Sequence, residues 1–281
     1  MSLDSSNERW LVNGTSLSQY CWAVKTFGGS PRALPTFRGQ DISVAYIPGK
    51  IFRSKFPDSR VVSLLMWVAG IVPSTGQPAA DTHLQFSDNL RTLHSLIYTP
   101  SSQVQLTREW RYTVSGTPTI VSATANAQIA GDAQPTMTAP GRADFSADFL
   151  LADPYFYGST VSATVPYNSN TTVTNPGDDV VAYNNFTLTF HGPLFYPILT
   201  NTTNLASITI NTLIALGDSI TVDVANYQAT HSNGSDMRGV VQHSASRRWM
   251  TFNTGANVLN LSSSLSTDSG TVGVSFQPPY V

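Results

Sequence analysis

The stretch NFTLTFH, Asn185–His191, alternates polar and apolar residues, with Phe186, Leu188 and Phe190 at every second position. Successive side chains of a β-strand point to opposite faces, so this spacing predicts a strand with one buried face. The same alternation recurs in the C-terminal third at Ile208 and Ile210, at Ile220, Val222 and Val224, at Leu259 and Leu261, and at Val272, Val274 and Phe276. Gly-Asp, Asn-Gly and Ser-Gly pairs separate these segments, and such a series is typical of a β-sandwich or barrel.

The N-terminal half predicts further strands and one helix. The strands are expected near residues 43–46, 60–72, 103–114, 119–129 and 143–151. Between Asp81 and Tyr98 four apolar residues fall at helical spacing, namely Phe86, Leu90, Leu93 and Ile97. Asp81 is suited to cap the N-terminus of this helix, and Thr99-Pro100 is suited to end it. The helix is expected to pack its apolar face against a sheet.

A loss of apolar residues marks the stretch Gly158–Asp179, which also contains the turn-forming pair Pro176-Gly177. This stretch is interpreted as a linker. The expected domains are therefore residues 1–160 and residues 161–281. The fold class expected is mainly β, with an N-terminal barrel-like or sandwich-like domain that holds one α-helix, followed by a C-terminal β-sandwich.

Composition and charge limit the classes of protein to consider. The chain has 281 residues, of which 41% are hydrophobic and only 11% charged, so it can bury a core. Up to Ile120 there are eleven Lys and Arg against seven Asp and Glu, and after it four against ten, which gives +4 and −6. This asymmetry indicates different neighbours for the two halves, but it is too diffuse for sequence-specific nucleic-acid binding.

Targeting and redox signals are few. Cys21 is the sole cysteine, so no intrachain disulfide forms, and the Cys and His spacing does not suit zinc. The N-terminal residues lack the apolar core of a signal peptide, and no apolar stretch reaches membrane-spanning length. Synthesis in the cytoplasm and no membrane insertion are therefore expected.

Catalytic chemistry finds little support in the sequence. The chain has only two glutamates, Glu8 and Glu109, and its aspartate pairs, Asp178-Asp179 and Asp218 with Asp223, suit turn and surface roles. The five histidines are scattered, and no glycine-rich phosphate loop occurs. No enzymatic activity, no metal site and no cofactor are expected.

Five short sequence elements follow one another between Leu34 and Ile71. They are Arg38-Gly39-Gln40-Asp41, Pro48-Gly49, Phe52-Arg53, Asp58-Ser59-Arg60 and Trp67-Val68-Ala69-Gly70. In order and spacing this series resembles the N-terminal domain of the distal tail proteins of long-tailed, non-contractile phages. The resemblance continues more weakly at Leu106 and Arg108, in Ala143–Gly158, and at Trp249, Gly255 and Asn257, which are similar to the family's galectin-like closing sandwich. Phe252-Asn253-Thr254 departs from the family's Leu-x-Pro, and residues 158–200 match only in polarity.

The resemblance implies a structural protein of the virion tail tip, made in the host bacterium. It implies a ring, usually of six subunits, in which the N-terminal domains pack side by side and galectin-like sandwiches project outward. The implied partners are further copies of the chain, the tail tube protein, the tape-measure protein, and the tail-tip hub and receptor-binding proteins.

A ring interface joins two different patches of the same subunit, so one face must complement another. The candidate interface residues are Arg38, Asp41, Arg53, Lys55, Asp58 and Arg60. The arginines and the lysine among them are suited to pair with carboxylates of a neighbour. Two alternatives remain open: these residues form a solvated hairpin in which Arg60 merely flanks its own strand, or Arg38 and Asp41 pair internally.

Two functions of other classes are weighed against the ring. The first is a carbohydrate-binding module, with Trp249 and Tyr227 as the aromatic residues that would hold a sugar. A tryptophan on an alternating strand is more often part of a core, and a module leaves the N-terminal half unexplained. The second is an enzyme that degrades cell wall, which the shortage of paired carboxylates disfavours.

Overall fold

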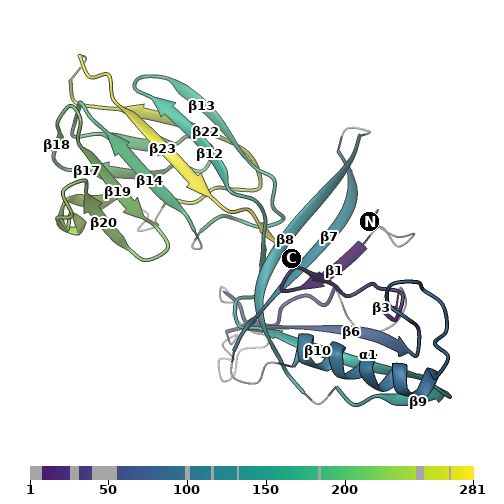
Figure 1. Cartoon of the computed structure of the whole chain (residues 1–281). Helices are drawn as coiled ribbons and strands as arrows, with labels where there is room; N and C mark the ends of the chain where they lie inside the picture. The colour runs from purple at the N-terminus through teal and green to yellow at the C-terminus, as the bar shows by residue number, and fades with distance from the viewer. Residues whose placement is uncertain are drawn as a thin grey trace, which may run out of the picture. The chain divides into compact units, whose positions relative to one another are not determined.

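The computed structural model describes residues 8–25, 32–39, 56–98, 102–114, 117–131, 133–182, 185–244, 250–265 and 267–281. Within these residues the chain is mainly β, with a single α-helix in the N-terminal half (Figure 1). The chain divides into two compact units, one through Phe156 together with Val281, and one from Tyr157 to Tyr280. The mainly β fold expected from the alternating segments is confirmed.

The N-terminal unit is built on one open antiparallel sheet. Its elements are β1 (Glu8–Val12), β2 (Thr15–Ser16), β3 (Trp22–Val24), β4 (Phe37–Arg38), β5 (Phe56–Pro57), β6 (Arg60–Ala69), α1 (Thr82–Ile97), β7 (Val104–Val114), β8 (Thr117–Ile129), β9 (Thr136–Ala139), β10 (Arg142–Leu151) and β11 (Phe156–Tyr157). The main strand order is β2-β1-β7-β8-β10-β6-β3, and the sheet curves into a half-barrel. β4 and β5 form a separate two-stranded ladder.

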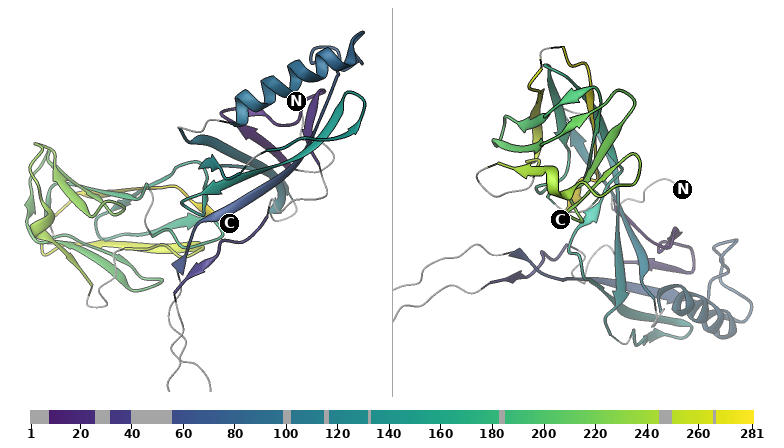
Figure 2. Two further views of the ribbon diagram at one scale, coloured as in Figure 1. Left: turned by 90° about the horizontal axis from the view of Figure 1, so that it is seen from below. Right: turned by 90° about the vertical axis from the view of Figure 1, so that its left-hand side faces the viewer.

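β6 and β10 pair over their full lengths, from Arg60 opposite Leu151 to Ala69 opposite Arg142. Alternate residues of both strands enter the core, namely Val62, Leu64, Met66, Val68, Ala143, Phe145, Ala147 and Phe149. α1 lies along these two strands in different views of the molecule (Figures 1 and 2). The helix and the β6–β10 ladder therefore enclose one hydrophobic core.

α1 begins as its sequence predicts. The side chain of Asp81 accepts hydrogen bonds from the backbone N–H groups of His83 and Leu84, at 3.1 and 2.9 Å. Asn89, on the buried face, donates to the carbonyl oxygens of Ala69 and Ile71, both at 2.8 Å. The two hydrogen bonds of the Asn89 side chain tie the helix to the backbone at the end of β6, in addition to the apolar contacts.

The C-terminal unit contains two five-stranded antiparallel sheets among the residues described. Its elements are β12 (Val161–Pro166), β13 (Asn170–Asn175), β14 (Thr187–His191), β15 (Leu194–Phe195), β16 (Ile198–Asn201), β17 (Ala206–Ile210), β18 (Leu213–Ile214), β19 (Ser219–Asp223), β20 (Gln228–His231), the 3-10 helix η1 (Arg238–Val240), β21 (Val241–His243), β22 (Gly255–Ser262), β23 (Thr271–Phe276) and β24 (Pro279–Tyr280). The orders are β12-β23-β14-β19-β20 and β13-β22-β16-β17-β21. This is the sandwich that the alternating segments predict.

The apolar residues of the alternating segments are buried in the core of the sandwich. Its centre is a cluster of three aromatic rings, Phe186, Phe252 and Phe276, with centroids 4.9 to 6.3 Å apart. Beside it the buried amide groups of Asn201 and Asn257 bond to each other and to backbone atoms. Buried polar groups of this kind are tolerated because they find hydrogen-bond partners.

The linker expected at residues 158–179 is wrong. This stretch contains β12, which pairs with β23, and β13, which pairs with β22. The two strands lie at the edges of the two sheets, and only a few of their side chains reach the core. The division between the compact units falls between Phe156 and Tyr157, whereas the boundary was expected after residue 160.

Replacing the helix cap, Asp81→Ala, is expected to lower the free energy of unfolding by about 1 kcal/mol, because two backbone N–H groups lose their acceptor. Urea denaturation followed by tryptophan fluorescence measures this change, since four of the five tryptophans lie in the N-terminal unit. Asp88→Ala, on the exposed face of α1, is the matched control. Equal effects of the two substitutions would contradict a capping role.

Candidate subunit interface and buried charges

The candidate interface residues fall into three groups. Asp41, Arg53 and Lys55 lie outside the described residues. Arg38 and Asp58 are exposed and lie at the ladder of β4 with β5. Two hydrogen bonds extend this ladder, from the Asp58 backbone N–H to the Thr36 carbonyl at 2.7 Å, and from the Thr36 hydroxyl to the Ser59 carbonyl at 3.3 Å. The ladder thus holds Arg38 and Asp58 on one small, solvent-exposed element.

Two large apolar side chains are exposed at the same ladder. Leu34 is 74% exposed and Phe37 is 61% exposed, and Phe37 directly precedes Arg38. Neither residue is among the candidate interface residues expected from the sequence, all of which are charged. Exposed apolar side chains next to charged ones are typical of surfaces that bind other proteins. We refer to Leu34, Phe37, Arg38 and Asp58 as the ladder surface.

Pairing with a neighbouring subunit would require Arg60 to lie on the surface of the chain, but it is buried. Its side chain is 2% exposed, and its guanidinium lies 5.6 Å from the ring centroid of Phe156. Burial, and then the charge of Arg108, lower the pKa of Arg60 to about 10. The placement corresponds to the alternative in which Arg60 belongs to its own strand.

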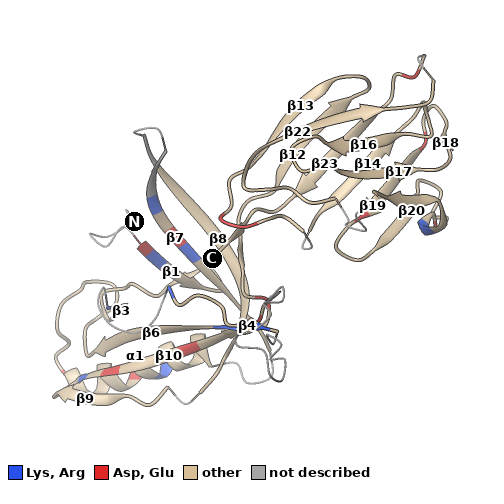
Figure 3. Ribbon diagram, turned by 180° about the vertical axis from the view of Figure 1, so that it is seen from behind, with Lys and Arg blue, Asp and Glu red and all other residues tan. Residues whose placement is uncertain are grey.

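A chain of ion pairs follows β1 and β7, whose charged residues lie side by side in Figure 3. Arg9 pairs with Glu109, directly opposite on β7, at 2.5 Å. Glu8 accepts from Arg108 Nε at 2.7 Å and from Arg32 Nη2 at 2.6 Å.

Arg108 also stacks on aromatic rings. Its guanidinium lies 4.7 Å from the ring centroid of Trp110 and 5.8 Å from that of Trp10. Because Arg108 is buried, its pairing with Glu8 is a structural interaction of the unit and not a surface contact.

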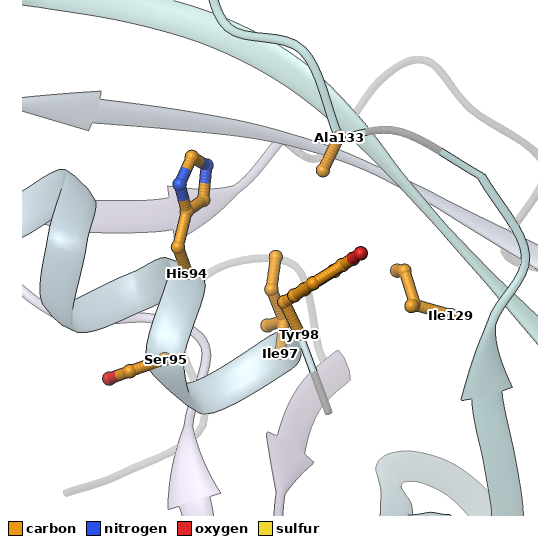
Figure 4. Close-up of a pocket in the computed structure, with 6 residues that line it drawn as sticks. All are labelled: His94, Ser95, Ile97, Tyr98, Ile129 and Ala133. Atoms are coloured by element: carbon orange, nitrogen blue, oxygen red, sulfur yellow. The ribbon is translucent and has the colours of Figure 1, made fainter. Parts of the chain in front are cut away.

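A cavity of about 380 Å³ opens between the end of α1 and the end of β8 (Figure 4). Its lining residues are His94, Ser95, Ile97, Tyr98, Ile129 and Ala133. The Nε2 atom of His94 is buried and has no hydrogen-bond partner among the described residues. The cavity therefore combines mainly apolar walls with one hydrogen-bonding nitrogen, which suits an aliphatic or aromatic group. Its residues come from two separate segments of the chain, the end of α1 and the region of Ile129 and Ala133, and they show no motif.

The residues nominated for sugar binding are only partly described. Trp249 lies outside the described residues. Tyr227 is 48% exposed and lies in the turn between β19 and β20, with φ of 54°. An aromatic pair that the sequence did not single out, Phe195 and Tyr196, has ring centroids 4.4 Å apart. Sugar binding in this unit stays a prediction.

Two of the aspartates considered for catalysis, Asp218 and Asp223, bind within turns. Asp223 accepts from the backbone N–H and the side chain of Asn226, at 3.0 and 2.7 Å. Asp218 lies near the His231 ring, 3.8 Å from Nε2, and near the Ser232 hydroxyl, at 3.5 Å. The backbone N–H of Asn233 donates to His231 Nδ1 at 3.2 Å, so the nitrogen nearest the hydroxyl already accepts a hydrogen bond. The Ser-His-Asp contacts thus shape a hairpin turn and do not form a general-base arrangement.

The described part of the chain shows neither a metal-binding cluster nor a membrane-spanning helix. Its histidine, cysteine, aspartate and glutamate side chains form no group of three that could hold a metal ion. None of its helices has the length and apolar character needed to cross a membrane.

Glu8→Gln is expected to lower the free energy of unfolding of the N-terminal unit by about 1–3 kcal/mol, because the buried Arg108 loses its negatively charged partner. Urea denaturation followed by tryptophan fluorescence measures the change. Asp236→Asn, which breaks the exposed pair of Asp236 with Arg238, is expected to change nothing measurable. If Glu8→Gln left the free energy of unfolding unchanged, the pair of Glu8 with Arg108 would not stabilise the unit.

Comparison with known proteins adds a likeness along the whole chain. No protein-family model matches the sequence, and no curated protein is significantly similar to it. Among solved structures, the Dit (gp 19.1) protein of phage SPP1, described as a paradigm of the hub adsorption apparatus in phages that infect Gram-positive bacteria, matches with a TM-score of 0.62 at 15% identity. The match covers 96% of this chain and 98% of that one. A protein of the activated phage p2 baseplate matches at a TM-score of 0.38 and 10% identity, over 98% of this chain and 99% of that one.

The fold expected from the family resemblance is therefore found. The likeness to the SPP1 protein includes both compact units, because so little of either chain is left unmatched. Over 96% of its length the chain matches the fold of the distal tail protein of phage SPP1.

Proposed function

We propose that this chain is a distal tail protein, a structural component of a phage tail tip. The observation that carries the proposal is the fold likeness to the SPP1 protein over 96% of the chain. The elements Arg38–Gly70, read from the sequence alone, indicate the same family independently of that likeness. In this function the chain forms a ring of six subunits that joins the tail tube to the tail-tip apparatus.

A ring requires each subunit to present two different, complementary surfaces. The ladder surface is our candidate for one of them. Leu34 and Phe37 supply apolar area that is costly to leave in water, and Arg38 and Asp58 supply charges that fix orientation. The contributions of Asp41, Arg53 and Lys55 to the same contact stay predictions.

The partners follow from the place of such a ring in a tail. One face of the ring would bind the tail tube protein and the end of the tape-measure protein. The other face would bind the tail-tip hub and the receptor-binding proteins. The opposite net charges of the two parts of the chain, +4 up to Ile120 and −6 after it, suit neighbours of different charge.

Self-assembly is tested by light scattering coupled to size-exclusion chromatography. We expect a particle near six times the 30.3 kDa mass of one chain, and a lower mass at raised salt, because salt screens charge pairs at an interface. A monomer at every concentration tested would contradict assembly in solution. Antibody labelling of virions that carry the protein then tests its place independently, since label on the capsid or along the tube would contradict a tail-tip role.

The ladder surface is tested by Phe37→Asp. A carboxylate in place of this exposed apolar side chain is expected to raise the protein concentration needed for ring assembly by about tenfold or more. The reason is that the interface would have to desolvate a charge. Leu205→Asp is the control, since Leu205 is 77% exposed on the other unit and its φ of 61° is one that Asp tolerates. Equal assembly of the Phe37→Asp variant and the wild type would remove this surface from the interface.

A further inference from the structure

Arg60 places a positive charge inside the N-terminal unit. It belongs to the largest fully buried side chains of the chain, at 2% exposure. Charged side chains are almost never buried to this degree unless they are paired, because the loss of hydration is costly. A buried arginine therefore calls for an anion or for several neutral acceptors.

The described residues do not supply those acceptors. Neither Nε nor Nη1 of Arg60 has a hydrogen-bond partner among them. The Phe156 ring, whose centroid is 5.6 Å from the guanidinium carbon, attracts the cation through its face. A ring face does not accept the N–H groups that lie in the guanidinium plane, so these donors stay unmatched.

The carboxylate that pairs with the neighbouring cation Arg108 is that of Glu8. Glu8 accepts from Arg108 at 2.7 Å and from Arg32 at 2.6 Å. The charge of Arg108 acts on Arg60 as a repulsion and is the second cause, after burial, of its lowered pKa. At a pKa of about 10 Arg60 still keeps its proton at neutral pH. The buried guanidinium of Arg60 thus lies in the field of a second cation, and no carboxylate is found to pair with it among the described residues.

We propose that Arg60 binds a small monovalent anion, chloride or a simple carboxylate such as formate, at its unpaired N–H groups inside the N-terminal unit. The anion accepts the hydrogen bonds that Nε and Nη1 leave unmade, and it offsets the repulsion between Arg60 and Arg108. Arg60 is the first residue of β6, where local opening of a strand end gives an ion access to the interior. The site belongs to the single chain and does not depend on ring formation.

The first test measures thermal unfolding by tryptophan fluorescence while sodium chloride replaces sodium gluconate at constant sodium concentration. Constant ionic strength keeps screening equal, and the response of an Arg60 variant then separates specific binding from the general effect of each anion on protein hydration. For a dissociation constant on the order of 10 mM, about 100 mM chloride favours the folded state roughly tenfold. A parallel series with formate distinguishes a carboxylate from chloride as the preferred ion.

The variants are Arg60→Met and Arg142→Met. Arg60→Met removes the charge from the buried site and is expected to fold and to lose the response to chloride and formate, because a buried charge is often replaced by an apolar side chain without loss of stability. Arg142 is exposed and its guanidinium lies 5.3 Å from the Trp67 ring centroid, so Arg142→Met removes a comparable ring contact at the surface. This control is expected to keep the full anion response.

Crystals of the wild-type chain grown in bromide give a direct readout that does not depend on any variant. An anomalous peak within hydrogen-bond distance of Arg60 Nε or Nη1 is the expected result. Stability that is the same in chloride, formate and gluconate would overturn the proposal, and a bromide peak without such dependence would mark an adventitious ion only. An anion response that persists in Arg60→Met would also overturn it, by placing the ion elsewhere.

Discussion

The antiparallel pairing of β6 with β10 is the constraint on which the N-terminal unit depends. These strands pair along all ten residues of each and bury alternate side chains beneath α1. Where β6 ends, the backbone must pass close to the start of the helix. A Cβ atom at Gly70 would lie 2.0 Å from the carbonyl oxygen of Thr82, so this position admits only glycine without a shift of the backbone. The turn, the helix and the ladder are therefore fixed together.

Much of the fold could be predicted from the sequence because one face of most strands meets water. In β14, β19 and β23 polar residues alternate with apolar ones, and this pattern predicts both the strand and which of its faces is buried. β12 and β13 escaped prediction because edge strands need few apolar residues. Val165 and Val173 are the positions at which these two strands bury a large apolar side chain, which leaves a composition that is indistinguishable from a polar loop.

The candidate site was less accessible to prediction, and Arg60 shows why. It lies two residues before Val62 on the same face of β6, in register with Leu64 and Met66. That spacing alone assigns it to the interior, but β6 is apolar on both faces, so its sequence shows no clear alternation. A charged residue at the start of such a strand is then easily taken for a surface residue. Phe37 was missed for the opposite reason, because an isolated phenylalanine gives no indication that it is exposed.

The order in which the strands pair has a consequence for how the chain is made. β7 and β8 are consecutive and pair as a hairpin, so this part of the first unit needs only local contacts. The second unit pairs Val165 with Val272 and Thr171 with Leu259. Its first two strands therefore cannot pair until the last strands of the unit have been synthesised. During translation the edges of β12 and β13 therefore stay unpaired until nearly the whole chain has left the ribosome. Their sparse apolar content, which hid them from prediction, also makes them poor templates for aggregation during that delay.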